Sequence, residues 1–199
     1  GRVGLCHLLT DKGGVRSEFT VHRTGPEQFY LVSAGAFERH DFDYLQKLRP
    51  RDGTVDLQKV TTQQGVFVLA GPRSRELLQR ITRVDLSNEV FPWLVGKEAD
   101  LGVAHGRVLR VNFVGELGYE LHHPIEMQNY LFDLLFEAGG DLGLRPFGIR
   151  AMDALRLEKS YRLVPRELSI EYAALESGLQ RFVKFDKADF TGKAGLSRW

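Results

Sequence analysis

Three glutamates stand at positions where a carboxylate could meet a flat, nitrogen-rich ligand. Glu18 lies in an alternating stretch just after Gly13-Gly14, and Glu116 and Glu120 flank a glycine turn. A carboxylate accepts two parallel N–H bonds well, so a ligand with an amino-pyrimidine edge would supply the donors that such a side chain needs. Phe113, seven positions before Glu120, could form an aromatic wall. The residue types leave open the alternative that the glutamates are solvated and that Phe113 packs in a core.

The cysteine and histidine residues exclude several other chemistries. Cys6 is the only cysteine, which rules out an internal disulfide and a zinc site built from several cysteines. Its neighbour His7 would point to the other side of a strand, so we expect Cys6 to be a buried structural thiol rather than a nucleophile. His122 and His123 would diverge in the same way, and no HExxH, GxGxxG or P-loop motif is present. We therefore predict no metal site and no dinucleotide-binding fold.

The charges of the chain almost cancel, and its apolar content is that of a globular domain. Its 199 residues include 27 Lys plus Arg and 26 Asp plus Glu, which gives a formal net charge of +1, and 43% are hydrophobic. A charge near zero argues against nucleic acid as a partner, because such binding draws on bulk electrostatic attraction. No apolar run approaches the ~20 residues of a membrane helix, so we expect no membrane partner and a cytoplasmic location.

The first part of the chain predicts two strands, a helix, and a second strand–helix pair. Residues 15–22 alternate after a glycine turn, residues 28–33 return as a second strand, and the two predict a hairpin. Residues 35–48 carry apolar side chains at helical spacing. The continuous apolar run at 66–70 is typical of a strand buried on both faces, and a helix over 74–81 follows it.

The second part predicts another antiparallel pair and two more helices. Residues 107–114 and 119–122 flank a glycine turn as paired strands. A helix begins at Pro124 and ends at Gly139-Gly140, and another covers 149–159, while 179–185 is read as a last strand. Hairpins mixed with separate helices indicate an α+β fold rather than a doubly wound parallel sheet.

Five blocks of the chain resemble, in the same order, the glycine-cleavage T-protein (aminomethyltransferase) superfamily. The blocks are LCHLLTDKGGVRSEFTV at 5–21, GVFVLAGPRSRELL at 65–78, VGELGYEL at 114–121, ALRLEK at 154–159 and DFTGKA at 189–194. The LRLEK and SEFTV forms look most like the C-terminal module of the dimethylglycine and sarcosine dehydrogenase/oxidase flavoproteins.

The resemblance implies a domain plan as well as a fold. It predicts that residues 1–185 form a folate-binding core of T-protein type and that residues 186–199 begin the connection to a C-terminal β-barrel. In this branch an FAD-containing flavin domain precedes the module in the same polypeptide. We therefore expect the chain to be a fragment of a longer protein, located in the mitochondrial matrix if the source is a eukaryote.

The resemblance also assigns roles to three residues. Glu18 matches the carboxylate that faces the reactive nitrogens of tetrahydrofolate, Glu120 matches the carboxylate that holds the pterin edge, and Phe113 matches an aromatic residue beside the cofactor. Two positions depart from the pattern, because Leu5 stands where a tyrosine is common and Met152 stands where an arginine lies near the pterin. Glu18 is itself one methylene longer than the usual aspartate.

The implied activity is one-carbon transfer from a methylated amine to folate. An iminium formed by oxidation of an N-methylglycine-type substrate would be trapped as 5,10-methylenetetrahydrofolate, with Glu18 handling the proton. Two alternatives stay open: a non-catalytic regulatory or structural module of the same fold, and a free-standing folate-dependent demethylase.

Overall fold

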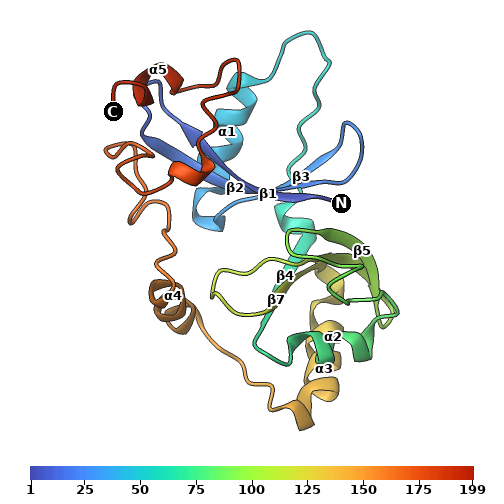
Figure 1. Cartoon of the computed structure of the whole chain (residues 1–199). Coiled ribbons are helices and arrows are strands. Elements are labelled where there is room, and N and C mark those ends of the chain that lie inside the picture. Colours follow the sequence, from blue (N-terminus) through green and yellow to red (C-terminus); the bar gives the residue numbers. More distant parts are fainter. The chain divides into compact units, whose positions relative to one another are not determined.

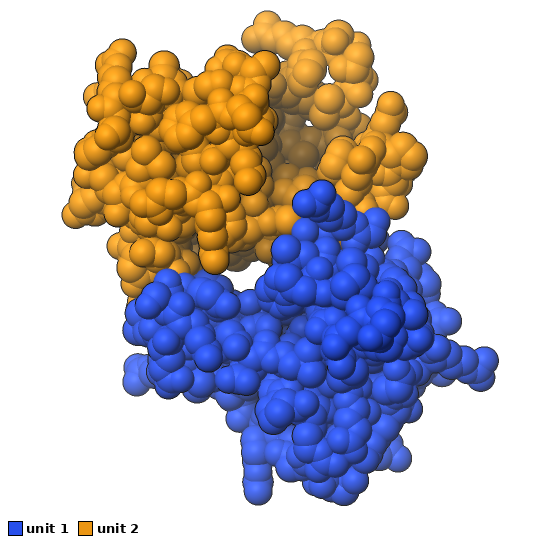
Figure 2. Space-filling model, in the orientation of Figure 1, with its two compact units in different colours: residues 1–3, 60–161 blue, residues 4–59, 162–199 orange.

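Two antiparallel sheets organise the chain, one in each of two compact units. The computed structural model describes residues 1–199. Unit 1 comprises Gly1–Val3 and Val60–Tyr161, and unit 2 comprises Gly4–Lys59 and Arg162–Trp199, as coloured in Figure 2. Each unit is therefore built from segments that are distant in the sequence.

Unit 2 is built on a three-stranded sheet in the order β1-β2-β3 (Figure 1). Its elements are β1 (Val3–Leu9, whose first residue belongs to unit 1), β2 (Val15–Arg23), β3 (Phe29–Val32), the 3-10 turn η1 (Gly35–Phe37), α1 (Glu38–Leu48), η5 (Gln180–Phe182) and the short α5 (Lys193–Leu196). Strands β2 and β3 form the predicted hairpin, with Thr20 opposite Val32. The core joins the two ends of the chain, because Leu9 and Val15 pack with Leu168, Ala174 and Leu196.

Unit 1 is built on a four-stranded antiparallel sheet in the order β4-β7-β6-β5. Its elements are η2 (Thr61–Gln63), β4 (Gln64–Ala70), α2 (Ser74–Ile81), β5 (Gly96–Leu101), β6 (Ala104–Leu109), β7 (Gly118–Pro124), η3 (Ile125–Met127), α3 (Gln128–Gly139), η4 (Gly140–Leu142) and α4 (Ile149–Glu158). Helices α2 and α3 lie against one face of the sheet (Figure 1). Leu78 and Leu131 from these helices are fully buried with Tyr119 and Leu121 of β7, so this face is the core.

Three of the predicted strands differ from the structure. Strand β6 ends at Leu109 rather than 114, because Asn112 accepts hydrogen bonds from the backbone of Val114 and Gly115 and turns the chain out of the ladder. Strand β4 is not buried on both faces, since Val66 and Val68 are exposed on the face opposite the core. Residues 179–185 contain η5 (Gln180–Phe182) and no strand, because local hydrogen bonds from Phe182 to Leu179 and from Val183 to Gln180 take the backbone groups there.

The expectation for Cys6 was also wrong. This residue lies on β1 and is exposed rather than buried. The apolar core of unit 2 includes Leu9 of that strand but neither Cys6 nor its neighbour Leu5. None of the helices has the length and apolar content that crossing a membrane requires.

Candidate functional site

Glu18 lies on the half-exposed face of β2, as the alternation of that strand predicted. Its neighbours Ser17 and Phe19 are buried on the other face, so strand periodicity alone orients the carboxylate. The Nε2 atom of His7, on β1, lies 2.8 Å from Oε2 of Glu18. The side chain of His7 is 6% exposed and that of Glu18 is 22% exposed. A nearly buried imidazole therefore holds one oxygen of this carboxylate.

A cavity in unit 2 lies beside this pair. Its volume is about 310 Å³, and its lining includes His7 and Cys6 of β1, Tyr44 of α1, Phe182 of η5, and Lys184. The ring of Phe182 makes an edge contact with the imidazole of His7 at 5.1 Å. His7 thus forms part of the cavity wall and also bonds Glu18.

Glu120 lies on β7, on the face of the sheet opposite the core. Its cross-strand neighbours on that face are Val68 of β4 and Leu109 of β6. The side chain of Glu120 is 20% exposed, and its Oε2 lies 3.1 Å from Nε2 of His122, whose own side chain is 0% exposed. The carboxylate therefore sits between two apolar side chains with a buried imidazole at one oxygen.

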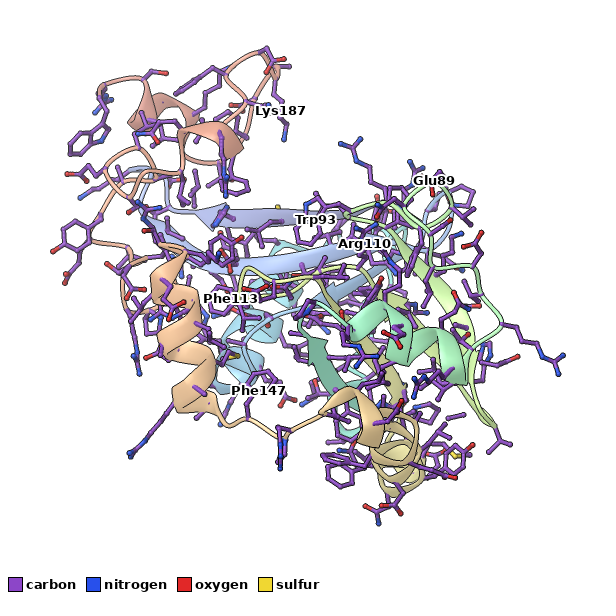
Figure 3. All side chains as sticks on the ribbon, turned by 60° about the horizontal axis from the view of Figure 1, so that its bottom comes forward. Glu89, Trp93, Arg110, Phe113, Phe147 and Lys187 are labelled. Carbon is purple, nitrogen blue, oxygen red and sulfur yellow. The ribbon has the colours of Figure 1, made fainter.

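Phe113 follows β6 and lies outside the apolar cores of both units. It is half-buried, and its ring stacks with that of Tyr161 at 6.1 Å and an interplanar angle of 22°. The guanidinium of Arg156, on α4, lies 5.9 Å from the centre of the Phe113 ring, which Figure 3 shows beside this helix. Arg156 is 1% exposed and donates hydrogen bonds to Asp153 and to the backbone carbonyl of Tyr161. Phe113 therefore belongs to an aromatic and cationic cluster, the Phe113 cluster, with Tyr161 and Arg156.

The structure brings together Glu120 with His122, and Glu18 with His7, but it does not decide whether the two carboxylates meet. Glu18 belongs to unit 2, whereas Glu120 and Phe113 belong to unit 1. Their convergence on one flat-walled cleft stays a prediction. Both departures from the family pattern lie on regular elements, since Leu5 is exposed on β1 and Met152 is half-buried on α4.

The two histidine partners are the functional candidates that sequence reasoning missed. Their residue types and spacing led only to the expectations that the histidines are not metal ligands and do not activate Cys6. A signal was present, because His122 stands two residues from Glu120 and a strand places such residues on one face. No group of three or more His, Cys, Asp and Glu side chains is placed to hold a metal ion.

Residues 1–187 match the family described as the GCVT N-terminal domain. The chain belongs to this family. The match confirms the resemblance to the glycine-cleavage T-protein superfamily, while the reading of residues 1–185 as one core and 186–199 as a connection stays a prediction.

Two curated relatives of this GCVT N-terminal domain are enzymes whose own names refer to methylated amines. Human mitochondrial dimethylglycine dehydrogenase is 38% identical over 200 residues, which cover 100% of this chain and 23% of that protein. The alpha subunit of sarcosine oxidase from Rhizobium meliloti is 34% identical over 203 residues, which cover 99% of this chain and 20% of that protein. The chain is therefore an aminomethyltransferase-like domain that spans about a quarter or less of these relatives.

A solved structure confirms the fold class. The aminomethyltransferase T of the glycine cleavage system from Bartonella henselae superposes with a TM-score of 0.81 at 23% sequence identity. The similarity covers 100% of this chain and 52% of that chain. The predicted α+β class of T-protein type is therefore correct.

Proposed function

We propose that this domain binds tetrahydrofolate and serves as the one-carbon acceptor module of a larger enzyme. When bound, tetrahydrofolate supplies nucleophilic nitrogens that take up the one-carbon unit and give 5,10-methylenetetrahydrofolate. The observation that best supports the proposal is that the family match spans residues 1–187 and includes two part-buried carboxylates, each with one oxygen bonded to a buried histidine.

The surroundings of Glu120 fit the amino-pyrimidine edge of a pterin. Its Oε2 lies 3.1 Å from Nε2 of His122, and the side chain as a whole is 20% exposed. Each carboxylate oxygen can accept two hydrogen bonds, so the group retains capacity for a forked pair of N–H donors. Val68, the cross-strand neighbour on β4, is 36% exposed and offers apolar contact to a flat ring, whereas Leu109 on the other side is fully buried. We assign recognition of the pterin edge to Glu120.

The surroundings of Glu18 fit a proton acceptor. A carboxylate that is 22% exposed, with its Oε2 bonded to His7, reaches both solvent and the protein interior. Formation of the methylene bridge would require the folate nitrogens to give up protons and the demethylated amine to leave with one of them, and a nearby carboxylate can accept or relay that proton. We assign the acceptance of that proton to Glu18.

The Phe113 cluster would contribute stacking rather than hydrogen bonding. A half-buried aromatic ring that already stacks on Tyr161 is ordered before a ligand arrives, so little conformational freedom is lost on binding. We assign contact with the folate ring system to Phe113.

The whole enzyme is part of the same proposal. We infer that an FAD-dependent flavin domain in the same polypeptide oxidises a methylated amine of the dimethylglycine or sarcosine type and delivers the iminium to this domain. The chain covers only 23% of the human dehydrogenase, which leaves ample length for such a domain in a relative of that size. That relative is named as mitochondrial, so we propose the mitochondrial matrix for a eukaryotic source and the cytoplasm otherwise.

Titration of 5-formyltetrahydrofolate into the chain by calorimetry tests the proposal. The Glu120→Ala variant should bind at least ~10-fold more weakly, because hydrogen bonds to a charged group contribute about 1.5–3 kcal/mol each. Glu137→Ala, which removes an exposed carboxylate on α3, is the matched control and should bind normally.

Two outcomes would contradict the proposal in different ways. Equal affinities of Glu120→Ala and the unchanged chain would refute the assignment of the pterin edge. Absence of binding by the unchanged chain would favour the non-catalytic module, which the departures at Leu5 and Met152 would then explain.

A further inference from the structure

His122 occupies an unusual place for a polar side chain. It lies on the sheet face opposite the core, in a cross-strand row with Arg107 of β6 and Val66 of β4, and its side chain is 0% exposed. Glu120 stands two residues earlier on the same strand and face. A buried imidazole is costly unless its ring nitrogens are bonded, so this placement calls for a partner.

The contact between the two side chains supplies that partner. Nε2 of His122 lies 3.1 Å from Oε2 of Glu120. If the carboxylate is ionised it can only accept hydrogen bonds, and Nε2 would then carry the hydrogen and donate it. The bond anchors one carboxylate oxygen, while the Glu120 side chain as a whole stays 20% exposed.

We propose that His122 is a positioning residue of the folate site, where it orients the carboxylate of Glu120 for the pterin edge. The inference rests on the proposed function. A free glutamate side chain samples several rotamers and would lose that freedom when the ligand binds. The bond from His122 removes part of that freedom during folding, so the carboxylate is already oriented when the ligand arrives.

Burial distinguishes this pair from an ordinary surface contact. His105 and Asp100 form a comparable pair at 2.7 Å, but their side chains are 68% and 77% exposed. Water competes for an exposed hydrogen bond and screens its charge, whereas the wholly buried ring of His122 has a fixed position. His105 is therefore a matched control for the loss of an imidazole–carboxylate contact.

The test is calorimetric titration of 5-formyltetrahydrofolate into the unchanged chain and three variants. His122→Leu removes the donor and should weaken binding about tenfold. His122→Gln keeps an N–H donor at a similar reach and should recover most of that loss, while His105→Leu should bind normally. Thermal unfolding of each variant, measured alongside, shows whether affinity changes without loss of the fold.

A spectroscopic measurement covers the case in which His122→Leu does not fold. In the unchanged chain, long-range proton–nitrogen NMR spectra should show a hydrogen on Nε2 of His122, and Glu120→Gln should shift that signal. A ring that lacks this hydrogen would overturn the proposal.

The binding results separate the two proposals. If the unchanged chain binds folate and folded His122→Leu binds equally well, or if Gln rescues nothing, the positioning role is wrong and the folate function stands. If the unchanged chain does not bind folate, both are wrong.

Discussion

At the scale of single residues, a buried histidine accompanies each of the two glutamates that the sequence singled out. His7 reaches Glu18 from the neighbouring strand, and His122 reaches Glu120 along the same strand. In both pairs one carboxylate oxygen is engaged and the carboxylate stays about one-fifth exposed. Such a group is oriented by the protein and still accessible to a ligand, which is the combination that a binding or proton-transfer role requires.

Glu18→Gln separates proton transfer from binding. The amide keeps the shape of the side chain but is a far weaker base, so methylene transfer in the intact parent enzyme should slow at least ~100-fold, the lower end of general base effects of about 10²–10⁴-fold. The affinity for 5-formyltetrahydrofolate should change by much less. Stopped-flow measurement of transfer, with calorimetry on the same variant, checks both expectations.

Glu27→Gln is the control for that experiment, because Glu27 is an exposed carboxylate in the loop between β2 and β3. The Glu27→Gln variant should transfer the methylene group at the normal rate. Unchanged transfer by Glu18→Gln would remove Glu18 from the chemical step.

At the scale of elements, the turn between β1 and β2 is held from outside by the last part of the chain. The backbone N–H of Val15 donates to Ser169, and the N–H of Ala174 donates to Gly13. Gly14 approaches this segment so closely that a Cβ atom there would lie 2.3 Å from the carbonyl oxygen of Ile170. The glycine is therefore required by the contact between two backbones, a reason that the turn alone does not supply.

Gly14→Ala should destabilise the fold by about 1–3 kcal/mol, the usual cost of forcing an extra group into a packed site. Gly4→Ala, on β1, is the control, because a Cβ atom at Gly4 meets nothing within 4 Å. It should be neutral or slightly stabilising. Urea unfolding of both variants measures the difference in their free energies of unfolding. Equal midpoints would show that the backbone near Ile170 shifts to accommodate the added Cβ atom without loss of stability.

Helix α2 is joined to the end of α3 by exposed ion pairs that predict a pH dependence. Arg80 bonds Asp141 and the carbonyl of Ala138, and Arg73 bonds Glu76. The hydrogen bond from Arg80 lowers the pKa of Asp141, and that from Arg73 lowers the pKa of Glu76. A lowered folded-state pKa stabilises the fold above the unfolded value and loses this contribution as the pH falls through the folded value.

Arg80→Met should therefore lower the urea midpoint at pH 7 and have less effect at a pH below the ordinary carboxyl range of about 4. The effect should be modest and should weaken in high salt, because the pair is exposed. Arg83→Met, an exposed arginine of the following loop, is the control and should leave the midpoint unchanged. A deficit for Arg80→Met that is constant from pH 7 to 3 would show that packing, rather than charge, is lost.

At the scale of the whole molecule, each of the two units draws on both early and late parts of the chain, and the site residues are divided between them. Unit 2 holds Glu18, and unit 1 holds Glu120 and Phe113. The chain is also only 23% and 20% of the length of the two relatives described. Most of the length of those two proteins therefore lies outside the part that this domain matches.

Hydrogen exchange tests whether one ligand serves both carboxylates. If Glu18 and Glu120 contact the same folate, saturating 5-formyltetrahydrofolate should slow amide exchange in peptides from β1–β2 and from β7 over the same concentration range. Peptides from the exposed segment 50–58 should be unaffected. Protection confined to one of the two strand regions would contradict the predicted convergence.

Local patterns in the sequence were sufficient to predict much of the fold. Alternation predicted β2 and the outward face of Glu18, and helical spacing predicted α1, α2 and α4 nearly to their ends. The family blocks predicted the T-protein fold. These features depend on neighbours within a few residues, where side-chain period and turn chemistry dominate.

Tertiary structure decided what depends on contacts between distant residues. It exposed Val66 and Val68 on a strand read as fully buried. Two other differences are local: hydrogen bonds to Asn112 ended β6 early, and three-residue hydrogen bonds formed η5 within residues 179–185. Tertiary structure also paired His7 with Glu18, eleven positions away, which spacing could not reveal without the register of β1 and β2. Periodicity states which way a side chain points, whereas only the packing of strands and segments determines what stands opposite it.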